Sequence, residues 1–190
     1  ESFLRVIHPD DRERFRSNVA AALAGARLYE SEHRIVRPDG EVRNVSEWGT
    51  VEWDTDGTPA RLVGIAIDIT ERKAAEKALA STTALLDTFF ETAPIGLGVF
   101  DRELRYVRVN GRLAEMNGLP AQAHIGRGTN DILSGIEDLD RVLALGKEVI
   151  TTGQPRLNVE VLGVTPAAPG RRRSWTNSYY PIRAGGEIVG

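Results

Sequence analysis

The sequence contains no cysteine among its 190 residues. Without a thiol the chain cannot form disulfides or thiolate metal sites, and it has no sulfur nucleophile. Its three histidines, His8, His33 and His124, are isolated from one another, with no spacing typical of a shared metal site. We therefore expect neither a metal site nor thiol chemistry.

The chain also lacks strong basic character and long hydrophobic runs. Its formal net charge is −3, and no part is basic enough to hold a nucleic-acid backbone. The apolar run "LVGIAI" is far too short to span a membrane, and no signal peptide is visible. We expect a cytoplasmic segment without nucleic acid as a partner and without direct membrane contact. Because the chain begins with Glu1 rather than Met, we also expect it to be part of a longer protein.

Motifs of catalysis are missing as well. There is no phosphoacceptor-histidine box, no nucleotide-binding glycine motif and no Ser-His-Asp arrangement. "GLGVF" contains two glycines, but these suit a strand that lies close to its neighbours, and as a phosphate loop the motif is very weak. We therefore expect no catalytic residue and no enzymatic activity in this chain.

The first 70 residues show signals for one helix and three strands. "IHPDDRERFRSNVAAALAG" predicts a helix with Pro9 at its first position and Gly25 at its end. The turns "RPDGE" and "DTDGTP" separate the strands of an antiparallel meander. Large and small residues alternate along the third strand, residues 61–69, so we expect it to be covered on both faces and central in its sheet.

A helix follows this strand without a loop. Thr70 is well placed as its N-cap, and we expect Asp68 to form hydrogen bonds that set the direction of the helix, with plain capping as the alternative for both residues. The pattern predicts one continuous helix over residues 71–92. Its apolar positions alternate spacings of four and three, the pattern of a coiled coil: Ala75, Leu79, Thr82, Leu86, Phe89 and Ala93.

The helix therefore has two interpretations. Leu79, Leu86 and Phe89 form the seam of a homodimer, or the helix is amphipathic and packs on its own domain.

The second half repeats the pattern of the first. A hairpin around residues 101–103 is followed by a short helix that Asn110 caps and that runs through Met116. A longer helix ends at Gly153, and two strands and the beginning of a third follow. We expect three parts: residues 1–70 as the C-terminal half of a first domain, 71–93 as a helical linker, and 94–190 as a second domain that lacks most of its last strand.

"FLRVIHPDDRERF", "RPDGEVRNV" and "LVGIAIDITERKAAEKAL", in this order, resemble the second half of a PAS domain, a bacterial sensory fold. "FFETAPIGLGVFDRELRYVRVNGRLAEMNGLPAQAHIGR", with "LNVEVLGVTPAAPG" and "SYYPI", resembles a second PAS domain like those of multi-sensor histidine kinases. The resemblance implies an α+β fold: a five-stranded antiparallel sheet with helices on one face, in tandem domains joined by a helix. It also implies a covalently linked output domain.

The resemblance further implies a small pocket in each domain. Candidates in the second domain combine apolar lining with polar groups: Phe100, Asn110, Met116, Ile132, Leu143, Trp175, Asn177 and Tyr179. We expect this chain to be a sensory and signal-relay module of a bacterial signal-transduction protein, namely a sensor histidine kinase. The module is expected to bind a small ligand and to transmit the signal through the linker helix. The alternatives are a structural dimerisation spacer without ligand, or the sensor of a diguanylate cyclase or phosphatase.

The sequence does not identify a cofactor. The absence of cysteine excludes a flavin–cysteine adduct and a thioester-linked chromophore, and no motif supports non-covalent flavin. Some PAS domains hold haem through a histidine on the long helix, where His8 lies, but a histidine before "PDD" is more simply a helix-start residue.

The ends of the two domains suggest a strand exchange. In the PAS arrangement the final strand lies between the first and the fourth. Because the second domain ends at Gly190, residues 63–69 of another chain are expected to complete it in a swap-like dimer, unless the sequence was clipped from a longer chain.

Overall fold

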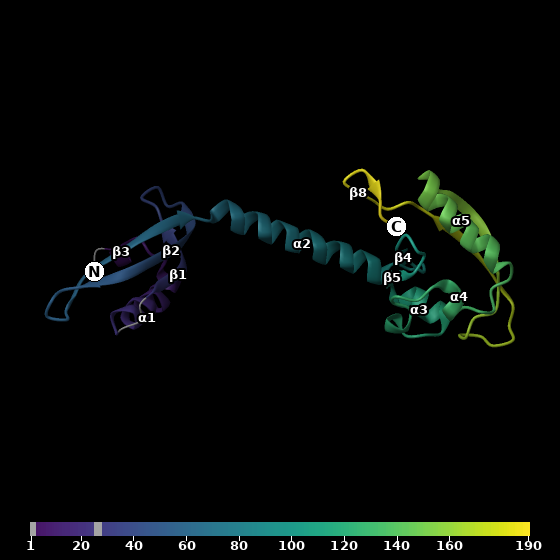
Figure 1. Ribbon diagram of the computed structural model, residues 1–190, viewed down its shortest axis with the longest axis horizontal. Helices are drawn as coiled ribbons and strands as arrows, with labels where there is room; N and C mark the ends of the chain where they lie inside the picture. The colour runs from purple at the N-terminus through teal and green to yellow at the C-terminus, as the bar shows by residue number, and fades with distance from the viewer. Residues whose placement is uncertain (1–2, 25–27) are drawn as a thin grey trace. The chain divides into compact units, whose positions relative to one another are not determined.

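The computed structural model describes residues 3–24 and 28–190, so the expected helix end at Gly25 lies outside the described residues. The chain divides into two compact units, residues 1–83 and 84–190 (Figure 1). The division falls inside α2 (Thr70–Thr92), which is one continuous helix as predicted. No helix in the described part is both long and apolar enough to cross a membrane.

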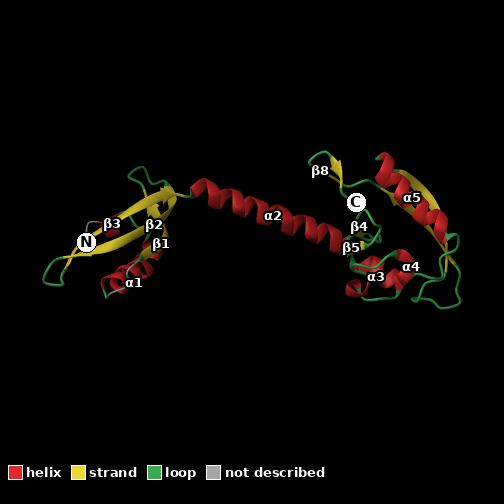
Figure 2. Cartoon of the chain, in the orientation of Figure 1, coloured by secondary structure: helices red, strands yellow, loops and turns green. Residues whose placement is uncertain are grey.

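Unit 1 places helical segments before an antiparallel meander (Figure 2). Its described elements are η1 (Phe3–Arg5), η2 (Pro9–Asp11), α1 (Arg12–Leu23), β1 (Tyr29–Val36), β2 (Val42–Trp53) and β3 (Pro59–Asp68). The strand order β1-β2-β3 confirms the predicted meander. The predicted helix therefore starts as a 3₁₀ turn at Pro9 and becomes α-helical at Arg12.

The core of unit 1 lies between α1 and the sheet. Along β1, alternate residues are buried, which is the pattern of a strand with one face on a core. The buried cluster consists of Ile7, Phe15, Ala22, Tyr29 and Val51. Burial of this cluster holds α1 against β1 and β2.

The prediction that the third strand is central and covered on both faces is wrong for this structure. Within the described residues β3 pairs only with β2, so it is an edge strand, and all of its residues are exposed. Val63, Ile65 and Ile67 retain 43%, 63% and 48% of their exposure. Large and small residues do alternate along the strand, but within the described residues none of its side chains is buried.

Unit 2 combines small helices with antiparallel two-stranded ribbons. Its elements after α2 are β4 (Gly98–Phe100), β5 (Tyr106–Val109), α3 (Gly111–Asn117), η3 (Ala121–Ala123), α4 (Thr129–Ile132), α5 (Leu139–Thr152), β6 (Arg156–Gly163), β7 (Arg173–Tyr179), β8 (Arg183–Ala184) and β9 (Glu187–Ile188). Described strands pair as β4-β5, β6-β7 and β8-β9. The α+β class is as expected, but the described strands of unit 2 pair as two-stranded ribbons and not as the expected five-stranded sheet. Completion of the unit by residues 63–69 of a second chain stays a prediction.

The helix ends of unit 2 follow their sequence signals. Asn110 is the N-cap of α3, where its side chain accepts a hydrogen bond from the Leu113 N–H. The helix ends at Asn117, one residue beyond the predicted end. Gly153 ends α5 as predicted, with the positive φ of 67° that glycine adopts without strain.

Candidate functional site

The junction between β3 and α2 is held by Asp68. Its Oδ1 accepts a hydrogen bond of 2.9 Å from the Thr70 N–H. The guanidinium of Arg43 lies 3.6 Å from Oδ2. Hydrogen bonds from Thr70, together with the charge of Arg43, lower the pKa of Asp68. The carboxylate therefore accepts the hydrogen bond of the first N–H of α2.

Thr70 has a different role from the predicted N-cap. It is the first residue of α2 rather than the residue before it, and its Oγ1 accepts a hydrogen bond of 2.8 Å from the Asn44 N–H. The Asn44 carbonyl in turn accepts a bond of 2.8 Å from the Ile69 N–H. Both backbone groups of Asn44 thus tie the start of α2 to β2, which the sequence could not show.

Ion pairs to β1 add to this connection. Glu32 accepts contacts from Lys73 Nζ at 2.7 Å and Arg72 Nη2 at 3.1 Å. The hydrogen bond from Lys73 is the main reason that the pKa of Glu32 is lowered. Exposed pairs of this kind contribute little net stability, so they orient the helix more than they stabilise the unit.

The other end of α2 is held by Arg108 of β5. Its guanidinium lies 2.7 Å from an oxygen of Asp87 and 3.2 Å from one of Glu91. It also lies 4.1 Å from the centre of the Phe90 ring, a cation–π contact. Three residues on adjacent turns of α2 thus contact one side chain of unit 2.

Asn110 forms the second contact at this end. It is completely buried, and its Nδ2 donates to the carbonyls of Phe90 and Ile95 at 3.0 and 2.9 Å. Its Oδ1 accepts from the N–H groups of Leu97 and Leu113, each at 2.9 Å. Because all of these groups are used within the chain, Asn110 has no donor or acceptor left for the ligand contact expected of it.

The other pocket candidates divide into three groups. Phe100 and Ile132 belong to the hydrophobic core of unit 2. Trp175, Asn177 and Tyr179 alternate along one half-buried face of β7, where Asn177 Nδ2 donates to the Tyr179 hydroxyl at 3.3 Å. The remaining candidates, Met116 on α3 and Leu143 on α5, are also half-buried.

The sequence analysis missed a buried polar cluster in the same core. Asn117 and His124 are almost completely buried, with Asn117 Nδ2 at 3.0 Å from His124 Nε2. His124 Nδ1 lies 3.0 Å from the Pro120 carbonyl, so we assign its proton to Nδ1. Tyr106 packs edge-on at 5.2 Å, and burial raises its pKa. The sequence signal that could have indicated this cluster is the inward position of Tyr106 in "YVRV".

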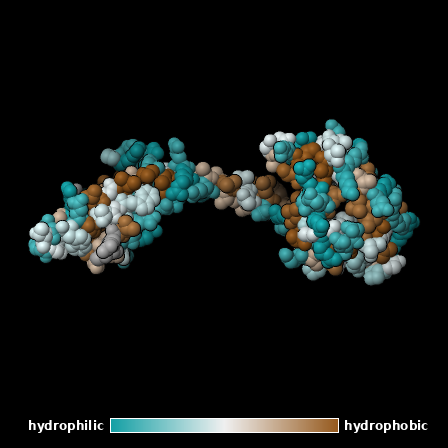
Figure 3. Space-filling view, in the orientation of Figure 1, coloured by the Kyte–Doolittle hydropathy of each residue, from teal (hydrophilic) through white to brown (hydrophobic). Residues whose placement is uncertain are grey.

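The predicted dimer seam is exposed. Leu79, Leu86 and Phe89 retain 70%, 62% and 63% of their exposure. Figure 3 shows hydrophobic residues on the open surface of α2. If the helix packed on its own domain, this stripe would be buried. The described part of the chain leaves it exposed instead.

The histidines are not gathered around a metal. No group of His, Cys, Asp or Glu side chains within residues 3–24 and 28–190 is arranged to hold one. His8 instead accepts a hydrogen bond of 3.4 Å from the Asp10 N–H at the start of η2, in line with its interpretation as a helix-start residue.

These features define a class of protein: two α+β units in tandem, coupled by a helix that is bound to a sheet at each end. Two family models described as the PAS fold match the chain, over residues 1–66 and over residues 90–190. The second match alone covers more than half of the chain, and the chain belongs to the PAS-fold family as a tandem PAS sensory protein.

Relatives with descriptive names are sensors and signalling proteins. The chain is 36% identical over 83 residues to the methyl sulfide methyltransferase-associated sensor of Methanosarcina acetivorans, covering 43% of this chain and 8% of the relative. It is similar to the structure of a sensory box histidine kinase/response regulator from Burkholderia thailandensis, with 35% identity, a TM-score of 0.40, and coverage of 44% of this chain and 63% of that one. The PAS domain of a GGDEF family protein from Chromobacterium violaceum shows 41% identity and a TM-score of 0.23, covering 34% of this chain and 59% of that one.

The matched segment is a small part of these curated proteins. The chain spans less than a tenth of the length of the curated relatives it matches. A sensory role follows from the PAS-fold family and the curated sensor relative, whereas the ligand and the output need separate arguments.

Proposed function

We propose that this chain is the sensory and relay part of a bacterial sensor histidine kinase, acting in the cytoplasm, where ATP is available to the kinase. The observation that carries the proposal is the attachment of α2 at both ends. Asn44 and Glu32 bind its start to the sheet of unit 1, and Arg108 and Asn110 bind its end to unit 2. Because each end is attached to a strand, a change in the geometry of either sheet displaces the helix.

The signal that we propose is a small ligand bound in unit 2. The half-buried face of β7 offers Trp175, Asn177 and Tyr179, which together provide apolar surface and polar groups. Phe100 and Ile132 supply the neighbouring apolar core.

Mass spectrometry of the purified chain under native conditions tests this directly by detecting a co-purified ligand. A metabolite screen by thermal unfolding is the second test, because a ligand that binds only the folded state raises the melting temperature. Trp175→Leu should abolish the rise, whereas Trp53→Leu, at an exposed position of unit 1, should preserve it. Absence of both a co-purified ligand and a selective rise would favour the spacer function.

We further propose that the chain forms a homodimer through α2. The exposed stripe of Leu79, Leu86 and Phe89 would otherwise leave a row of large apolar side chains in water. Replacing Leu79 and Leu86 with Asp should convert the dimer to a monomer in analytical ultracentrifugation.

Ser81→Asp with Ala84→Asp is the matched control, since both positions lie on α2 away from the seam. An unchanged dimer in the seam variant, or equal dissociation of both variants, would contradict a specific seam.

We propose that catalysis belongs to an output domain of the longer protein and that this chain has none. The purified chain should not incorporate phosphate from labelled ATP and should not hydrolyse nucleotides. Turnover that survives further purification and is lost on unfolding the chain would overturn this part of the proposal.

A further inference from the structure

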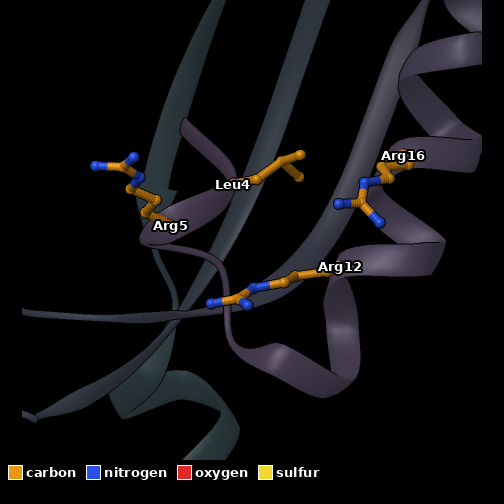
Figure 4. Close-up of a pocket in the computed structure, with 4 residues that line it drawn as sticks. All are labelled: Leu4, Arg5, Arg12 and Arg16. Atoms are coloured by element: carbon orange, nitrogen blue, oxygen red, sulfur yellow. The ribbon is translucent and has the colours of Figure 1, made fainter. Parts of the chain in front are cut away.

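A hollow on unit 1 gathers cationic side chains next to apolar surface. It has a volume of about 370 Å³ and is lined by Leu4, Arg5, Arg12 and Arg16. Leu4 and Arg5 come from η1, whereas Arg12 and Arg16 lie one turn apart on α1. Figure 4 shows Arg12 and Arg16 extending from α1 toward the side of η1 that carries Leu4, while Arg5 extends away on the other side.

The cations of this hollow are not neutralised by the described chain. Within residues 3–24 and 28–190, neither Arg5 nor Arg16 has an ion pair or a side-chain hydrogen bond. Arg12 is half-buried and uses only its Nε, which donates to the Ile7 carbonyl at 3.1 Å. This bond holds the guanidinium in place and leaves its two terminal nitrogens for another partner.

Asp11, the buried acid next to Arg12 in the sequence, pairs with other arginines. Asp11 is bound by Arg34, whose Nη2 lies 2.9 Å from Oδ1, and Arg14 lies 3.9 Å from the same oxygen. Hydrogen bonds from Arg34 hold the pKa of Asp11 well below its usual range. The carboxylate is therefore already occupied by Arg34, and within the described residues it forms no ion pair with Arg12 or Arg16.

An apolar trough adjoins the cationic hollow and shares Leu4 and Arg16 with it. The trough has a volume of about 340 Å³, and its other lining residues are Phe3, Phe15, Val19, Ala20 and Leu23. The rings of Phe3 and Phe15 lie 5.6 Å apart, and Phe3 and Leu23 retain 52% and 44% of their exposure. A cationic hollow beside an apolar trough suits a ligand that has an anionic group and an apolar body.

We propose that unit 1 binds a small anionic amphiphile, with its carboxylate at Arg12 and Arg16 and its apolar body along the trough. Guanidinium groups bind carboxylates through paired, charge-assisted hydrogen bonds, which supplies the specificity for the head group. The trough supplies the affinity for the body by removing apolar surface from water. This site is independent of the ligand proposed for unit 2.

The test is a titration of the isotope-labelled, 190-residue chain with octanoate, followed by NMR. The amides of Leu4, Arg12 and Arg16 should shift saturably. Acetate, which lacks the body, and octanol, which lacks the charge, should each bind at least tenfold more weakly.

Variants separate the two parts of the site. Arg12→Gln and Arg16→Gln should each weaken octanoate binding at least tenfold, and Leu23→Gln should weaken octanoate but not acetate. Arg171→Gln, at an exposed position in unit 2, is the control and should bind octanoate as the parent does. Circular dichroism verifies that each variant is folded.

Three results would overturn the proposal. Equal affinity for octanol would show that the arginines take no part, and equal affinity for acetate would show that the trough takes none. Binding of an acidic hexaglutamate peptide at these residues, without binding of octanoate, would assign the surface to a protein partner.

Discussion

Replacing Asn110 with Ala should destabilise unit 2 more than any other single polar substitution that we consider. The side chain is fully buried and joins the end of α2, the following turn and the start of α3. Alanine would leave the N–H groups of Leu97 and Leu113 and the carbonyls of Phe90 and Ile95 without this partner.

The magnitude follows from these contacts. Loss of an N-cap costs about 1 kcal/mol, and each buried polar group left unpaired costs about 1–3 kcal/mol. The backbone partners of Asn110 are only partly buried, so we expect a total loss of about 3–5 kcal/mol rather than the full sum. Small domains have a free energy of unfolding of about 5–15 kcal/mol, so unit 2 should lose a large share of its stability.

Hydrogen exchange measured by mass spectrometry is the appropriate assay. The two units need not unfold together, so a two-state fit to the whole chain would not report on unit 2 alone. Peptides that contain Leu97 and Leu113 should lose protection in Asn110→Ala, as should the end of α2. Asn177→Ala, which removes one bond of 3.3 Å in the same unit, is the control and should cost at most about 1.5 kcal/mol.

Asn110→Asp separates the two roles of the side chain. Aspartate keeps the acceptor for Leu97 and Leu113 but places a carboxylate against the carbonyls of Phe90 and Ile95. The loss should therefore be smaller at a pH low enough to protonate the new carboxyl than at neutral pH, relative to the parent chain at the same pH. If Asn110→Ala lost less than about 1 kcal/mol and retained native protection, the argument from unpaired buried groups would be refuted.

Three further predictions concern unit 1. Thr70→Val removes the acceptor for the Asn44 N–H and should cost about 1–2 kcal/mol, measured by hydrogen exchange of the peptide that contains Asn44, whereas Thr70→Ser should keep most of that stability. Hydrogen bonds from Arg34 lower the pKa of Asp11, so the stability that ionised Asp11 contributes is complete above the unfolded pKa of about 4 and is lost as the pH falls toward the folded value. Asp11→Asn should therefore flatten the fall of the melting temperature at acid pH. An unchanged fall in this variant would contradict the prediction. Burial raises the pKa of Tyr29 to about 12, so stability should fall as the pH rises from the unfolded pKa of about 10 toward that value, and Tyr29→Phe should remove this loss in the same measurement.

The sequence by itself determined the local elements and their order. Helix starts and ends depend on groups within a few residues, so Asn110 and Gly153 were read correctly as caps from the sequence alone. The turns and the alternation along residues 29–68 likewise determine a meander, because they set strand direction without reference to distant residues. The continuous helix predicted over residues 71–92 follows from the regular spacing of its apolar positions.

Only the tertiary structure decided how side chains are used. Asp68, not Thr70, satisfies the start of α2, because Thr70 instead meets Asn44, which lies 26 residues earlier. The hydrogen bonds from Asn110 to the end of α2 and the position of β3 at the edge of its sheet were likewise decided only by the tertiary structure. Periodicity shows which face of an element is apolar, but burial and hydrogen bonding depend on which distant elements lie against that face.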